Sequence, residues 1–225
     1  RLPEHLTTKK DIFEHVVDQF NPEGTHTFLE KTPRHIFFYS KILQYYPDAR
    51  FICMIREPKN VVSSQLTNSP KKNKSVIRLA LLYNKIAASI AKVKNNENTF
   101  LIRYEDLTTE IEIILKDICK FLNIEFDSKL VDNVAAPPGI VSEHEFWKNK
   151  YVKVKTIQKS NPANGEEFLD VYQENLVNFI TGSHAAEFGY ILKYKRNAVY
   201  KGFTSDFKHL ISPEEFKKIF SKIHG

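Results

Sequence analysis

The clearest element in the pattern of apolar and polar positions is a run of five apolar residues over 51–55, flanked by Arg50 and Arg56. This run is too short for a helix and too continuous for a half-exposed strand, so it predicts a buried parallel strand. Pro58 follows closely, and proline suits the first turn of a helix because it needs no amide donor there. We therefore expect the strand to lead directly into a helix over 58–67.

The rest of the chain alternates short apolar segments with longer runs of helical periodicity. Strands are expected near 26–30, 51–55 and 98–103, and helices at 8–20, 33–45, 58–67, 75–95, 110–123, 127–134, 165–181 and 213–223. This alternation predicts an α/β fold in which a parallel sheet is flanked by helices on both faces. The length favours a single domain over residues 1–225, with 135–163 as a long exposed connection.

Arg56 and Ser64 form the first candidate site. Arg56 emerges at the carboxyl end of a predicted strand, where α/β proteins hold phosphorylated ligands. Ser64 follows eight residues later, about two turns into the next helix. A guanidinium and a hydroxyl can both donate hydrogen bonds to one phosphate. The alternative is a surface arginine beside a helix serine that bonds to its own backbone.

Lys31 occupies a similar place one predicted strand earlier. It lies between the strand expected near 26–30 and the helix expected over 33–45, with Thr32 as N-cap. A lysine in that crossing can reach a charged ligand over the sheet edge. The alternative is an ordinary solvated lysine on a loop.

Charge and cysteine content narrow the classes of ligand. A net charge of +6 and a pI of about 9.1 suit a polyanionic ligand, although nucleic acid or an acidic membrane surface would suit them as well. Cys53 and Cys119 fall within predicted elements, so we expect buried thiols without a disulfide framework. The eight histidines lack ligand spacing, and we predict no metal site.

Three segments resemble the sulfotransferases that use 3′-phosphoadenosine 5′-phosphosulfate (PAPS) and release adenosine 3′,5′-bisphosphate (PAP). They read EKTPRH, YPDARFICMIREPKNVVSS and LIRYEDLTTEIEIILKDICKFLNI, and the likeness extends over residues 25–135. The resemblance implies a P-loop NTPase-like fold in which Lys31 faces the transferred sulfuryl group. It further implies that Arg56 and Ser64 hold the 3′-phosphate of the cofactor, and that Tyr104 lies against the adenine. An alternative for Tyr104 is packing at a strand end.

The tail is similar to the RKGxxGDWK loop of the cytosolic branch of that family. The match runs from Tyr200 to Lys208, and only Lys201 and Gly202 carry over as cofactor-binding residues, because Tyr200, Ser205 and Phe207 depart from the pattern. The resemblance implies that 197–225 closes over the 3′-phosphate. A capping box of Ser212 and Glu215 would begin the last helix.

One departure concerns the 5′-phosphosulfate loop, a glycine-containing turn that comes well before the KTP motif in this family. The seven glycines stand at 24, 139, 165, 182, 189, 202 and 225, and none opens a phosphate-loop pattern. We expect that the sequence begins partway into the domain. The alternative is a chain without the loop.

The expected reaction is in-line transfer of a sulfuryl group to a hydroxyl or amine of a small-molecule, carbohydrate or peptide acceptor. Lys31 would neutralise developing charge. His35 is the nearest candidate base, although Pro33 stands where the cytosolic branch has its catalytic histidine, and His35 can instead be a helix-surface residue. Glu30 lies close enough to take part or to pair with a neighbouring cation.

Three other functions fit parts of the pattern: a related P-loop kinase, a non-catalytic family member that binds an adenosine phosphate or polyanion, and a nucleic-acid-binding domain. The scattered lysine runs make nucleic acid the weakest of these. The sequence has no apolar run of membrane-spanning length and no signal peptide at its start, so we expect a cytoplasmic protein unless an anchor or targeting segment lies upstream.

Overall fold

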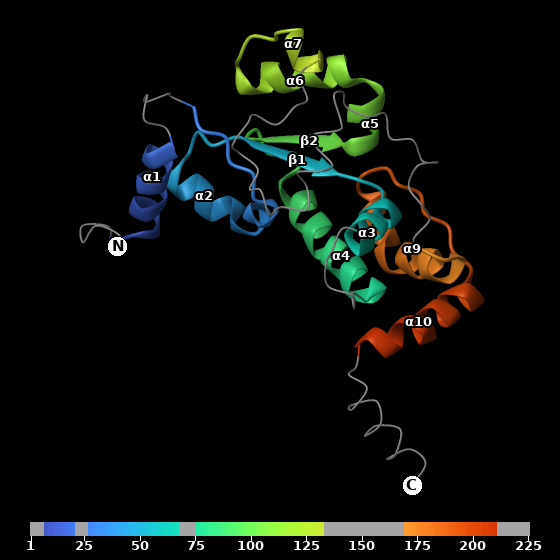
Figure 1. Ribbon diagram of the computed structural model, residues 1–225. Helices are drawn as coiled ribbons and strands as arrows, with labels where there is room; N and C mark the ends of the chain where they lie inside the picture. The colour runs from blue at the N-terminus through green and yellow to red at the C-terminus, as the bar shows by residue number, and fades with distance from the viewer. Residues whose placement is uncertain (1–6, 21–26, 68–74, 133–168, 211–225) are drawn as a thin grey trace. The chain divides into compact units, whose positions relative to one another are not determined.

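The computed structural model describes residues 7–20, 27–67, 75–132 and 169–210. The chain divides into two compact units, residues 1–49 and residues 50–225. Figure 1 shows the elements of both units with the labels used below. The expected connection over 135–163 and the expected capped helix over 213–223 lie outside the described residues.

The first unit contains α1 (Lys9–Phe20), the 3-10 helix η1 (Pro33–Phe38) and α2 (Tyr39–Tyr45). The start of α1 is capped reciprocally, because the Thr8 hydroxyl accepts from the Asp11 amide at 3.1 Å and the Asp11 carboxylate accepts from the Thr8 amide at 2.8 Å. Hydrogen bonds from the side chain and the amide of Thr8 to the Asp11 carboxylate lower the pKa of Asp11. The Phe13 ring of α1 meets Phe28 and Tyr46 edge to face, at 6.0 Å each.

The second unit holds the two strands of the described residues and the remaining helices. In chain order these are β1 (Phe51–Ile55), α3 (Pro58–Thr67), α4 (Val76–Val93), β2 (Thr99–Arg103), α5 (Tyr104–Thr109), α6 (Ile111–Leu122), α7 (Lys129–Asp132), α9 (Val171–Ala186) and α10 (Arg196–Leu210). The predicted bounds of β1 and α3 are confirmed, and the predicted helices that correspond to α1, α4, α6, α7 and α9 differ from them by a few residues at their ends. No helix was predicted where α5 and α10 lie.

The two strands pair in parallel, as predicted, with Phe51 opposite Thr99 and Ile55 opposite Arg103. Figure 1 shows α3 and α4 on one side of this pair and α6 and α7 on the other, the α/β arrangement expected from the alternation of elements. Cys53 and Ile55 are buried, whereas Ile52 and Met54 are 38% and 47% exposed. The expectation of a strand buried on both faces is therefore wrong for β1.

The strand expected near 26–30 is also absent from the part that the structure describes, residues 27–30. These residues are exposed and have no regular secondary structure, and Thr32, which precedes η1, has an extended backbone. The helix expected over 33–45 is divided into η1 and α2. An apolar pair such as Phe28 and Leu29 suggests a strand, but here no neighbouring strand of the described residues pairs with it.

The core of the second unit forms where α3, α4 and α9 meet. Val62, Val76, Leu79 and Val177 cluster there, with Leu66 and Leu169 packed against them. Burial of such branched side chains contributes about 1.5–3 kcal/mol each. This packing holds α3, and thus the residues at its start, against the rest of the unit. None of the helices in the described ranges is both long and apolar enough to cross a membrane.

A buried carboxylate joins α10 to the start of α4. Asp206 is 2% exposed and accepts from the Ser75 hydroxyl at 2.5 Å, from the Val76 amide at 2.8 Å and from the Ile77 amide at 3.0 Å. The first amides of a helix have no partner within the helix, so Asp206 caps α4 from a distant part of the chain. Ser75 caps the same helix locally by accepting from the Arg78 amide at 3.2 Å.

We predict that Asp206→Ala lowers the free energy of unfolding by about 3 kcal/mol, because it leaves a buried hydroxyl and two buried amides without their acceptor. Chemical denaturation followed by circular dichroism measures the change. The exposed neighbour Ser205 provides the control, Ser205→Ala, which we expect to change stability little. Equal unfolding midpoints for both variants would contradict the prediction.

Candidate functional site

The carboxyl edge of the β1 and β2 pair brings Arg56 and Tyr104 together. Since Ile55 is opposite Arg103, the next residue of each chain segment leaves the sheet at the same level. The Arg56 guanidinium carbon lies 4.3 Å from the centroid of the Tyr104 ring, a cation–π contact. The Arg56 Nε is buried and has no hydrogen-bond partner among the described residues. The Nε–H group of Arg56 is therefore a buried donor without an acceptor among the described residues.

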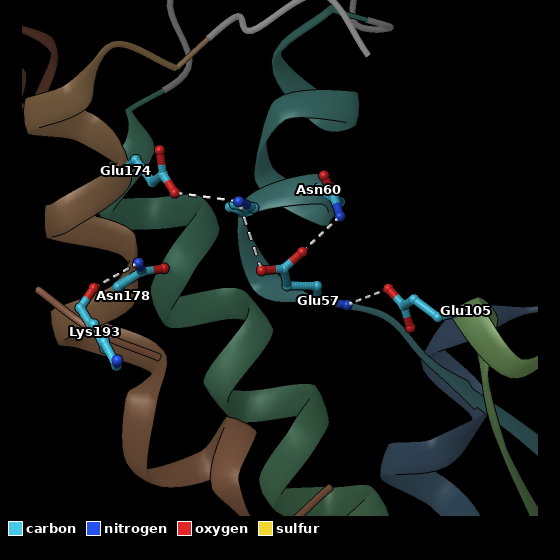
Figure 2. A network of polar contacts seen from close by, with 7 residues as sticks. Glu57, Asn60, Glu105, Glu174, Asn178 and Lys193 are labelled. Atoms are coloured by element: carbon cyan, nitrogen blue, oxygen red, sulfur yellow. Dashed lines mark hydrogen bonds and ion pairs between the residues drawn. The ribbon is translucent and has the colours of Figure 1, made fainter. Parts of the chain in front are cut away.

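The backbone that follows Arg56 is held from both sides. The Glu57 amide donates to the Glu105 carboxylate at 3.1 Å, and the Glu57 carbonyl accepts from the Asn60 and Val61 amides of α3 at 3.1 Å each. The Glu57 side chain accepts from Asn60 at 2.9 Å. Lys59 lies 3.8 Å from Glu57 and donates to Glu174 of α9 at 3.2 Å. Figure 2 shows this network between α3, α5 and α9.

The second oxygen of Glu105 binds Tyr190, whose hydroxyl donates to it at 2.6 Å. The Arg103 guanidinium lies 4.5 Å from the Tyr190 ring centroid. Burial and the bond to Glu105 raise the pKa of Tyr190, while Arg103 opposes that rise. A side-chain hydrogen bond between Arg103 and Tyr190 raises the pKa of Arg103. Tyr190 therefore stays a neutral donor, and Glu105 joins three segments of the chain.

Tyr83 of α4 lies in the electrostatic field of the same carboxylates. Its side chain is 4% exposed, and its hydroxyl has no hydrogen-bond partner in the described ranges. Burial, with the negative charges of Glu105 and Glu57, raises the pKa of Tyr83. Burial likewise raises the pKa of the Cys53 thiol to about 11, so this thiol stays protonated at neutral pH. Cys53 and Cys119 are both free and buried, as predicted.

Ser64 lies on α3, one turn beyond Asn60 on the same face of the helix, and is half-buried. The eight-residue spacing from Arg56 thus spans the strand end and the first two turns of α3, as expected. That Ser64 acts on a phosphate stays a prediction.

Lys31 and His35 belong to the first unit, where a carboxylate organises the loop before η1. Glu30 accepts from the Thr32 hydroxyl and lies 2.7 Å from Nδ1 of His35. Thr32 therefore makes no side-chain cap to η1, contrary to prediction. Glu30 pairs with His35, and Lys31 is exposed beside this pair.

Lys201 and Gly202 lie within α10 rather than in the loop implied by the family resemblance. The Lys201 ammonium lies 5.2 Å from the ring centroid of Tyr172 at the start of α9. A Cβ on Gly202 would come within 2.4 Å of the Tyr172 carbonyl oxygen, so only glycine permits this close approach of α10 to α9. Packing is sufficient to explain Gly202.

Sequence reasoning missed Glu105, Tyr190 and Arg103. Glu105 follows Tyr104 in the YEDL segment, so the family resemblance pointed to this segment. It did not indicate a role for Glu105. Its partners Glu57 and Tyr190 are 48 and 85 residues away, and no local spacing links them.

The family can be assigned by comparison with known proteins. The model of the sulfotransferase family matches residues 4–128, which include both strands and the segments containing Lys31, Arg56, Ser64 and Tyr104. The chain belongs to the sulfotransferase family. A search of curated proteins found no significant match.

Among solved structures, this sulfotransferase-family chain is similar to the sulfotransferase domain from the curacin biosynthetic pathway. The two share 19% sequence identity with a TM-score of 0.58, over 80% of this chain and 69% of that one. The likeness confirms the predicted fold.

Proposed function

We propose that the chain transfers a sulfuryl group from PAPS to an acceptor hydroxyl or amine. The observation that carries the proposal is Arg56, held over Tyr104 at the carboxyl edge of two parallel strands. Family membership supports sulfuryl transfer as the chemistry. The half-buried guanidinium with its buried Nε fits a phosphate acceptor, and the aromatic ring beside it fits a nucleoside.

Different residues would bind different parts of the sulfuryl donor PAPS. Arg56 and Ser64 would hold the 3′-phosphate, and Tyr104 would offer the adenine the ring face that Arg56 does not cover. Lys201, exposed on α10, is the candidate second cation, with Gly202 beside it. When bound, PAPS supplies an activated sulfuryl group whose departure leaves a stable bisphosphate.

The transfer residues would come from the loop before η1. Lys31 would neutralise negative charge that develops on the sulfuryl and bridging oxygens during transfer. Glu30 holds Nδ1 of His35 at 2.7 Å, which leaves Nε2 available to accept the proton of the acceptor. This use of Glu30 follows the general logic by which a carboxylate orients a catalytic imidazole.

We predict that Arg56→Ala weakens binding of PAP by about 1.5–3 kcal/mol, the usual size of a hydrogen bond to a charged group. Isothermal titration calorimetry measures the change. Arg78 of α4 is exposed, so Arg78→Ala is the control for loss of one positive charge. If Arg56→Ala binds PAP as tightly as this control does, Arg56 does not hold the 3′-phosphate.

We predict that Lys31→Ala lowers the rate of transfer at least about a hundredfold, because it removes charge stabilisation from the transition state, while PAP affinity changes little. Radiolabelled PAPS with a panel of phenols, alcohols, amines and saccharides provides the assay. The control is Lys41→Ala, an exposed lysine of the same unit. A variant that loses affinity but keeps its rate would contradict the role of Lys31.

The same panel tests a second candidate function. Arg56 and Tyr104 would also serve a family member that binds adenosine phosphates without transfer, since their arrangement is built within the second unit alone. Tight binding of PAP with no transfer to any acceptor would favour this function over the first.

A further inference from the structure

The direction in which Arg56 points depends on the peptide group that follows it. A peptide bond is planar, so a hydrogen bond to the Glu57 amide fixes the plane between Arg56 and Glu57 and thereby one of the two backbone torsions of Arg56. Glu105 supplies that bond at 3.1 Å, and the first turn of α3 holds the carbonyl of Glu57. The two peptide groups on either side of Glu57 are thus held by α5 and α3, directly after Arg56.

Two adjacent residues of α5 therefore hold Arg56 in two ways. Tyr104 contacts the guanidinium at 4.3 Å, and Glu105 binds the backbone through Glu57. Tyr104 and Glu105 follow the last residue of β2, and Arg56 follows the last residue of β1. The register of the sheet brings the start of α5 beside Arg56 and Glu57.

Glu105 is itself fixed by the segment after α9. Its second oxygen accepts from Tyr190 at 2.6 Å, so both oxygens are engaged and the carboxylate is not free to rotate. Arg103 lies over the Tyr190 ring at 4.5 Å. Gly189, at φ +81°, makes the left-handed turn that precedes Tyr190, and a Cβ there would contact Arg103 at 3.7 Å.

We propose that Glu105 is a positioning residue that sets the direction of Arg56 toward a 3′-phosphate, an inference that rests on the function proposed above. Electrostatics alone predicts the opposite effect of removing this carboxylate, because a negative charge beside an anion site repels the anion. Positioning predicts weaker binding of the 3′-phosphate when Glu105 is neutralised. Whether affinity for the 3′-phosphate falls or rises when Glu105 is neutralised therefore distinguishes positioning from simple electrostatic repulsion.

The test compares the affinities of the full chain for PAP and for adenosine 5′-monophosphate, which lacks the 3′-phosphate. In Glu105→Gln the side chain keeps one acceptor oxygen for two donors, so the Glu57 amide and the Tyr190 hydroxyl can no longer each donate to an oxygen of their own. The neutral amide oxygen is also a weaker acceptor than the carboxylate, so the bond that holds Glu57 is weakened. We expect the preference for the bisphosphate to fall about tenfold, as for one weakened charge-assisted contact. Tyr190→Phe removes only the hydroxyl that orients Glu105, and we expect a smaller fall in the same preference.

Asp106→Asn is the matched control, since Asp106 is the next acidic residue and lies 4.0 Å from Arg103, whereas the Glu57 amide donates to Glu105. It removes the same charge, and we expect it to keep or raise the preference. Circular dichroism checks that each variant is folded.

If the unaltered chain prefers the bisphosphate but Glu105→Gln and Tyr190→Phe keep that preference in full, the positioning role is wrong while the proposed function stands. Equal loss of both ligands in Glu105→Gln would also overturn it, because a general structural defect does not discriminate between them. If the unaltered chain shows no preference, the 3′-phosphate assignment fails, and the positioning role fails with it.

Discussion

Parallel pairing of β1 with β2 is the constraint on which the candidate site depends. The register ends both strands at one level, so the residues that leave the sheet, Arg56 and Tyr104, emerge side by side. A shift of one residue would turn every side chain of the shifted strand to the other face. Arg56 would then lose both its aromatic neighbour and the acceptor of the following amide.

Helix packing keeps that edge in place. The α3, α4 and α9 cluster fixes the helix that starts just after Arg56, and Lys59 ties its first turn to Glu174 of α9. Exposed ion pairs of this kind contribute about 0–1 kcal/mol, whereas the apolar cluster contributes several times more. The polar contacts at this edge therefore orient Arg56 and its neighbours more than they contribute to the free energy of unfolding.

The predictable parts are those encoded locally. An uninterrupted apolar run flanked by arginines and a following proline are sufficient for β1 and α3, whose bounds agree with prediction. The apolar pair Phe28 and Leu29 carries a similar but shorter signal, and its side chains are exposed without forming a strand. A strand requires a partner, which two or three residues cannot specify.

The site was predictable only where its residues stand at the ends of predicted strands. Arg56 and Tyr104 each stand at a strand end in the sequence, and their meeting follows from the parallel sheet. The role of Glu105 depends on donors 48 and 85 residues away, and Gly202 resembles a phosphate-loop glycine although it faces the Tyr172 carbonyl. The spacing of residues along the sequence does not predict contacts of this kind between distant segments.

The cap that Asp206 provides has a consequence for where this protein can be divided. The bond to Ser75 spans 131 residues, so the first turn of α4 is completed only when the end of α10 is present. A chain cut after α9 would leave the first amides of α4 without that acceptor, and it would remove the close contact of Gly202 with Tyr172 of α9. Residues up to 206 therefore belong to the minimal folding unit of this fold, although the family match itself ends at residue 128.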